Sequence, residues 1–186
     1  MIIASIQRER GEALRIVKKK DKRYPIDIVL ENGRVIKVPC QKYFTNGFLR
    51  SHGCSIMAEY LALQFIGIHI WPIYLLRWHK AFTKNEIKSK VTLRGVAEGI
   101  EDHGGICEYS ASVSEAKIRD ALRNGFTVIM EEKNPIHSIF LFHDSGKNYI
   151  INYGKVKRVN VTSIVKKATK NATYRGMVIT KRKAKT

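Results

Sequence analysis

Cys54 is the residue of this chain whose side chain is best placed for chemistry. It follows Gly53 and opens an apolar stretch with helical spacing. Unpaired backbone N–H groups and the helix dipole at such a position favour the thiolate, which is the reactive form of cysteine. The same amides can donate hydrogen bonds to an oxyanion. Because a cysteine without partners is more often a small buried apolar residue, a nucleophilic role requires a base elsewhere in the chain.

Candidate partners for Cys54 lie in the second half of the chain. His137 opens one strand-like run, Asn152 ends another, and a turn signal at Ser145-Gly146-Lys147 separates them. If the two runs pair as a hairpin, His137 and Asn152 lie side by side at its open end. Asn152 could then orient the imidazole, which completes a set of nucleophile, base and orienting group. The alternative interpretation is that His137 is a polar residue at a strand edge and Asn152 is a turn former.

Other chemistries have weaker support in the sequence. His52 precedes Cys54 by two residues and His103 precedes Cys107 by four, but structural zinc sites use closely spaced cysteine pairs and no Cys-x-x-Cys occurs. No glycine-rich phosphate loop is present. We therefore expect no metal and no cofactor. Three cysteines in 186 residues indicate free thiols rather than a disulfide framework.

The elements that carry these residues follow from the spacing of the apolar positions. Two β-branched runs around Asn32-Gly33 predict a hairpin over about residues 24–38, with Asn-Gly supplying the positive φ angles of a tight turn. Segment 40–53 is predicted to be a loop. Residues 54–67 have helical spacing, few charges and a terminal glycine, so a mostly buried helix is expected to carry Cys54.

The remaining segments predict helices followed by a sheet. A Thr-x-x-Glu pattern at Thr83 predicts a short polar helix toward Arg94, and a Ser-x-x-Glu pattern at Ser112 predicts a helix over 116–124. The chain then becomes strand-like over 126–130, 138–142, 149–152, 156–161 and 174–180, with a short helix at 162–168. This order predicts an α+β fold, with a helical first half, an antiparallel sheet over about 126–182, and a single domain over 1–186.

The order and spacing of these segments resemble a known family. Val38-Pro39-Cys40-Gln41, then Gly53-Cys54 opening an apolar helix, and later Ala121-Leu122-Arg123-Asn124-Gly125 before a strand, are similar to the papain-like cysteine peptidases that process bacteriocins with double-glycine leaders. The resemblance covers about residues 35–165. It implies a papain-like fold, in which a buried nucleophile helix packs on the antiparallel sheet.

The resemblance also implies a role for each candidate residue. Cys54 would be the nucleophile and His137 the general base. Asn152 falls where the family carries its third catalytic residue and would orient His137. Gln41 would join the Cys54 amide in the oxyanion hole. The implied activity is thiol-dependent hydrolysis of a peptide or protein substrate.

The sequence departs from the family's pattern at two positions. Ser55-Ile56 follows Cys54 where the family usually has Gly-Pro, and Asn152-Tyr153 stands where Asp-Pro is usual. Asparagine is the orienting residue in papain itself. The same triad would also serve an acyltransferase or amidase, in which an amine replaces water as the acyl acceptor.

The formal net charge of +18 is concentrated in the two flanks of the chain. Residues 1–50 carry +7, residues 51–150 are neutral and residues 151–186 carry +11. A strongly basic surface attracts nucleic acid and other anionic polymers. One interpretation is that the flanks recruit an acidic protein or an anionic polymer; the other is that the charge serves solubility, with a basic C-terminal tail over residues 181–185. The alternative function is a basic nucleic-acid- or polyanion-binding module with an inactive papain-like fold.

The sequence predicts no membrane span and no secretory signal. The most apolar stretch, 61–76, is interrupted by polar residues and by Pro72, and it falls short of the roughly 18 apolar residues that a span needs. The first ten residues reach Arg8 before any apolar run develops. A cytoplasmic location is the resulting expectation, and the sequence carries no signal for a particular oligomeric state.

Overall fold

A computed structural model of the chain describes residues 15–17, 25–82, 91–133, 136–170 and 174–181. The first half contains these elements: β1 (Arg15–Val17), β2 (Ile26–Val29), β3 (Val35–Val38), the 3-10 helix η1 (Gln41–Tyr43), α1 (Gly47–His52), α2 (Cys54–Phe65), α3 (Pro72–Phe82) and α4 (Leu93–Asp102). The second half contains β4 (Ile106–Ser110), α5 (Glu115–Arg123), β5 (Thr127–Glu132), β6 (His137–Asp144), β7 (Lys147–Asn152), β8 (Lys155–Arg158), α6 (Val161–Lys170) and β9 (Tyr174–Lys181). This is the expected α+β class.

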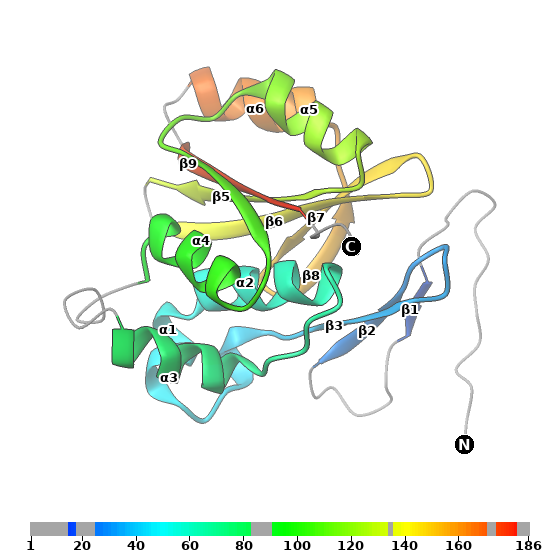
Figure 1. Cartoon of the computed structure of the whole chain (residues 1–186). Coiled ribbons are helices and arrows are strands. Elements are labelled where there is room, and N and C mark those ends of the chain that lie inside the picture. Colours follow the sequence, from blue (N-terminus) through cyan, green and yellow to red (C-terminus); the bar gives the residue numbers. More distant parts are fainter. Residues whose placement is uncertain (1–14, 18–24, 83–90, 134–135, 171–173, 182–186) are drawn as a thin grey trace.

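A six-stranded antiparallel sheet forms the centre of the fold, with helices on both of its faces (Figure 1). Its strand order is β4-β9-β5-β6-β7-β8, and β1, β2 and β3 form a separate three-stranded antiparallel sheet. Side chains on alternate positions of β6 enter two different cores. Phe140 and Phe142 pack with α2, α3 and α4 on one face, whereas Ile139 and Leu141 pack with α5 and α6 on the other.

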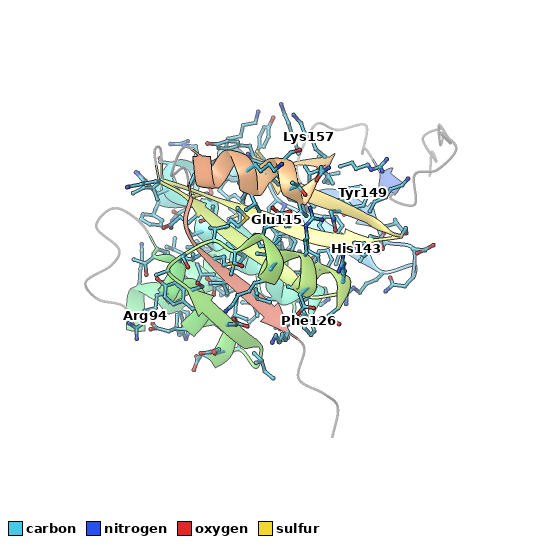
Figure 2. The ribbon with its side chains drawn as sticks, turned by 90° about the horizontal axis from the view of Figure 1, so that it is seen from above. Arg94, Glu115, Phe126, His143, Tyr149 and Lys157 are labelled. Atoms are coloured by element: carbon cyan, nitrogen blue, oxygen red, sulfur yellow. The ribbon has the colours of Figure 1, made fainter. Side chains whose placement is uncertain are left out.

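Helices α5 and α6 lie across the face of the sheet that is opposite α2 (Figures 1 and 2). Thr162 Oγ1 donates a hydrogen bond to Glu115 Oε1 at 2.8 Å and so joins the two helices. Their apolar sides cover one face of β5 and β6. The other face of these strands is thereby left to α2, the helix that begins at Cys54.

Helix α2 is buried on all sides, which explains why its sequence is apolar around the whole helix. Every residue from Ser55 to Gln64 is buried. The helix lies between the sheet and helices α3 and α4, and it also contacts β3. It ends where Gly67 adopts a left-handed backbone with φ +90°, as the sequence predicts.

Several predicted elements are confirmed, and one predicted turn has a different geometry. The first hairpin pairs β2 with β3 in antiparallel register, and the strands expected after residue 125 are all present within the sheet. Of Asn32 and Gly33, however, only Gly33 has a positive φ angle. The turn is closed by backbone hydrogen bonds between Leu30 and both Gly33 and Arg34, so it needs one left-handed residue and not two.

Other expectations are wrong. Segment 40–53 is not a loop, because η1 and α1 occupy most of it, and the Asn46 side chain caps α1 by accepting a hydrogen bond from the Leu49 N–H. The N-cap of α5 is Ser114 and not Ser112. The sheet also begins before residue 126, since β4 pairs with β9. The helix expected from Thr83 falls largely on residues 83–90, outside the described residues, and the helix that contains Arg94 starts at Leu93.

Among the residues that the structure describes, no helix combines the length and the apolar character needed to cross a membrane.

Candidate active site

Cys54 is the first residue of α2 and is half-buried. A single residue, Gly53, separates it from α1, and the Met57 N–H donates to the Gly53 carbonyl in the first turn of α2. Because Gly53 has no side chain, no side-chain cap occupies the start of this helix. The thiol therefore lies where the helix dipole favours a negative charge.

Gly53 is required by packing and not by its backbone angles. Its φ of −81° is open to any residue, but a Cβ built on it would lie 2.3 Å from the Leu49 carbonyl oxygen and 2.8 Å from the Leu49 Cα. Glycine thus permits α1 and α2 to meet closely at the residue before the thiol. The close contact between α1 and α2 therefore fixes where α2 begins, and with it the position of the Cys54 thiol beside His137 and Ser138 of β6.

His137 and Asn152 are brought together by the hairpin of β6 and β7. The strands are antiparallel around the Asp144–Lys147 turn, which places the start of β6 beside the end of β7. His137 Nε2 donates a hydrogen bond to Asn152 Oδ1 at 2.6 Å. This pairing is the one that the sequence predicts, and it leaves Nδ1 as the ring nitrogen available to the thiol.

A second histidine–asparagine pair lies at the other end of the same hairpin. His143 Nδ1 and Asn148 Oδ1 are 2.8 Å apart, and His143 is labelled in Figure 2. Neither residue is among those that line the pocket beside Cys54. The hairpin therefore carries two pairs of the same chemistry, of which one contacts a thiol. This second pair provides a matched control.

Cys54 and His137 shift each other's pKa in opposite directions. Burial by itself raises the pKa of the Cys54 thiol, but hydrogen bonds from His137 and from the Ser138 backbone N–H outweigh it, and the pKa lies below its ordinary value of 9.0. Burial likewise lowers the pKa of His137, but its hydrogen bonds with Cys54 and Asn152 outweigh burial, and the pKa lies above 6.5. Both shifts favour a thiolate–imidazolium pair.

Tyr153 covers one face of the imidazole. Its ring is parallel to that of His137, with an interplanar angle of 8° and centroids 4.1 Å apart. Its backbone carbonyl accepts a hydrogen bond from the thiol of Cys40 at 3.5 Å. Cys40 is buried beside the site. Sequence reasoning missed Tyr153, because tyrosine is not a residue that two-residue turns favour, and Gly154 was the only turn signal at this point.

Gln41 lies in the same pocket as Cys54 and His137. The pocket reaches inward between α2 and the β6–β7 hairpin, where Met57, Leu61, Phe140 and Ile151 give it apolar walls. The Gln41 Nε2 donates to the Arg50 carbonyl at 3.4 Å. The Gln41 side chain lines the pocket together with Cys54 and His137. All four residues singled out in the sequence thus lie together.

Metal-type clusters and the other cysteine with a shifted pKa can be compared with the candidate triad among the described residues. No group of three or more histidine, cysteine, aspartate or glutamate side chains that could hold a metal ion occurs in this part of the chain. Burial raises the pKa of Cys107 to about 12, so that thiol stays protonated at neutral pH.

Within the described part of the basic flanks, Lys155, Lys157 and Arg158 are exposed on the edge strand β8, and Lys157 is labelled in Figure 2.

Comparison of the sequence with protein-family models and with curated proteins gives no match.

Proposed function

We propose that this chain is a cysteine peptidase of papain-like fold that uses Cys54, His137 and Asn152 as its catalytic triad. The observation that supports it most strongly is the chain of hydrogen bonds from the Cys54 thiol to His137 and on to Asn152 Oδ1. A nucleophile, a base and an orienting group are joined in the order that nucleophilic catalysis requires. The resemblance over residues 35–165 points to the same roles.

The arrangement accounts for each step of peptide hydrolysis. His137 Nδ1 takes the proton from Cys54 Sγ, and the thiolate attacks the carbonyl carbon of the scissile peptide bond, so that a C–S bond forms and the carbonyl oxygen becomes an oxyanion. The Cys54 backbone N–H and the Gln41 amide donate to that oxygen. When the tetrahedral intermediate collapses, the C–N bond breaks and the imidazolium protonates the departing amine.

The second half of the reaction regenerates the thiol. A water molecule gives a proton to His137 and attacks the thioester carbon. The C–S bond then breaks, the carboxylic acid product leaves, and the proton on the imidazolium is shared again with the thiolate. Asn152 holds the imidazole in place through both transfers, because its Oδ1 accepts from Nε2 while Nδ1 does the chemistry.

The test is the pH dependence of iodoacetamide labelling, followed by intact mass and by peptide mapping. We expect Cys54 to be labelled rapidly near pH 6, because its pKa lies below that of an ordinary thiol. His137→Ala should slow this labelling, whereas the matched variant His143→Ala should not. Cys54→Ala should abolish it. Labelling of Cys54 only at alkaline pH, at the rate of Cys40 or Cys107, would contradict the proposal.

A labelled thiol establishes the nucleophile, and a second measurement establishes the reaction. The wild-type protein and Cys54→Ala are each incubated with a peptide library, and the products are identified by mass spectrometry. We expect new carboxyl termini in the wild-type sample alone. Products that carry an added amine in place of a free carboxyl group would instead indicate acyl transfer.

A further inference from the structure

The turn that follows Asn152 has a backbone that does not suit its first residue. Tyr153 and Gly154 are the two central residues of the β7–β8 hairpin, and their φ angles are +49° and +72°. A two-residue turn with two left-handed residues is of type I′ and favours Asn-Gly. Tyrosine has a bulky side chain and is disfavoured there. Gly154 suits the second position of the turn, but Tyr153 at the first position is a residue that this turn type disfavours.

The turn of the β6–β7 hairpin has the same backbone geometry but lies away from the candidate triad, so the residue types in the two turns can be compared. Its central residues are Ser145 and Gly146, with φ angles of +51° and +73°. Here a small polar residue occupies the first position, next to Asp144, whose carboxylate accepts from the Ser145 hydroxyl at 3.2 Å. The two turns share one geometry, and only the one beside the candidate triad carries an aromatic ring.

The left-handed backbone at Tyr153 directs its ring onto the catalytic base. The ring lies parallel to the His137 imidazole at 4.1 Å, while the residue just before it, Asn152, holds the same imidazole by its edge. The Tyr153 carbonyl accepts a hydrogen bond from the buried Cys40 thiol. One dipeptide, Asn152-Tyr153, thus fixes both the in-plane orientation of the imidazole and one of its faces.

We infer that Tyr153 is a positioning residue for the catalytic base, which holds the His137 ring in its plane and stabilises the imidazolium through the face of the phenol. This inference rests on the proposed function, because it assigns a role toward the same base. A cation over the face of an aromatic ring is attracted by its π electrons. The backbone strain at residue 153 is the cost of this arrangement.

Several other groups face His137 and act on the same equilibrium. Cys54 approaches from α2, Asn152 lies at the end of β7, and Glu132 of β5 is the register partner of His137. The Glu132 charge also favours the imidazolium. Partial burial and the nearby charges of Cys54 and Glu132 raise the pKa of Tyr153 above its ordinary 10.0, so its ring is neutral throughout the pH range of the test.

The test compares Tyr153→Asn, Tyr153→Phe and Ser145→Asn by two measurements, the melting temperature and the pH profile of iodoacetamide labelling at Cys54. Asparagine suits the turn, so we expect Tyr153→Asn to melt no lower than the wild type. Its labelling profile should nevertheless move to higher pH by roughly half a unit to one unit, because the imidazolium loses the aromatic face. Tyr153→Phe, which keeps the ring, should keep the wild-type profile.

Ser145→Asn separates the turn from the site. It should raise the melting temperature by about 2 to 4 °C without moving the labelling profile. If Tyr153→Asn lowers the melting temperature and leaves the profile unchanged, the ring has only a structural role and the inference is overturned. If the wild-type Cys54 itself reacts only at alkaline pH, the proposed function fails first, and this inference fails with it.

Discussion

The hydroxyl groups of Ser55 and Ser138 lie 2.9 Å apart in the interior of the protein, although 83 residues separate them in the sequence. Each follows a residue of the candidate triad directly, since Ser55 comes after Cys54 and Ser138 after His137. Both side chains are buried. This hydrogen bond therefore joins the start of the nucleophile helix to the start of the strand that carries the base.

We expect the two serines to be energetically coupled. Ser138→Ala leaves a buried hydroxyl without this partner and should lower the free energy of unfolding by about 1 to 3 kcal/mol. The double variant Ser55→Ala/Ser138→Ala should cost less than the sum of the two single variants, as a double-mutant cycle in denaturant would show. Ser51→Ala on the exposed surface of α1 is the control and should cost less than about 0.5 kcal/mol. Strict additivity would contradict the coupling.

The two histidine–asparagine pairs of the β6–β7 hairpin should respond differently to the loss of the amide. Asn152→Ala removes a hydrogen bond to an imidazolium, and we expect the rate of Cys54 labelling near pH 6 to fall roughly 10- to 100-fold. Asn148→Ala removes the corresponding bond to His143, and the rate should stay within about twofold of the wild type. Equal effects of the two variants would show that the hairpin's stability, and not the orientation of His137, governs labelling.

Gln41 should affect acyl chemistry but not alkylation. Iodoacetamide reacts at a saturated carbon, so no oxyanion forms and Gln41→Ala should label at nearly the wild-type rate. Hydrolysis of a peptide found in the library screen should fall by roughly 10² to 10³ in kcat, which is typical for the loss of one oxyanion donor. A parallel loss in both assays would mean that Gln41 supports the shape of the pocket and not the transition state.

Gly53→Ala should disturb the joint between α1 and α2. The added methyl group meets the Leu49 backbone, which cannot rotate away as a side chain would, so we expect a loss of about 1 to 3 kcal/mol in the free energy of unfolding and slower labelling of Cys54. Gly47→Ala at the start of α1 has open space around its new methyl group and should be neutral or stabilising. Equal stabilities for both variants, measured by chemical denaturation, would rule out this steric account.

The buried Glu59–His79 pair should make one variant sensitive to pH. Glu59 Oε2 and His79 Nε2 are 2.6 Å apart and both side chains are fully buried. Burial raises the pKa of Glu59 above its ordinary 4.5, and the contact with His79 opposes that rise. His79→Ala removes this opposition. The folded state then holds the Glu59 proton to higher pH than the unfolded state, so stability should fall as pH rises above 4.5.

The His79→Ala variant should lose more stability at pH 8 than at pH 5. Loss of one partner of a buried pair costs about 3 to 5 kcal/mol when the other remains charged, so His79→Ala should be that much less stable than the wild type at pH 8 and closer to it at pH 5. In Glu59→Gln/His79→Ala no carboxyl group remains to titrate, and this extra pH dependence should vanish. Its persistence in urea titrations of the double variant would assign it to another group.

Local features of the sequence were sufficient to predict several parts of the fold. The helix that begins at Cys54 and ends near Gly67 follows from apolar spacing and a terminal glycine. The pairing of His137 with Asn152 follows from two strand-like runs and one short turn, because neighbours in a hairpin are brought together by a few residues of connecting chain. The short helix α1 was not predicted, since six residues with one asparagine cap carry little periodic signal.

Tertiary structure alone decided which distant residues meet. Apolar periodicity shows that α2 and β6 are both buried, but it does not show that they are buried against each other. The contact of Cys54 with His137, the hydrogen bond between Ser55 and Ser138, and the pairing of β4 with β9 all depend on that packing. The side-chain period specifies a buried face and not its partner, because many apolar surfaces can cover it equally well until the whole core is assembled.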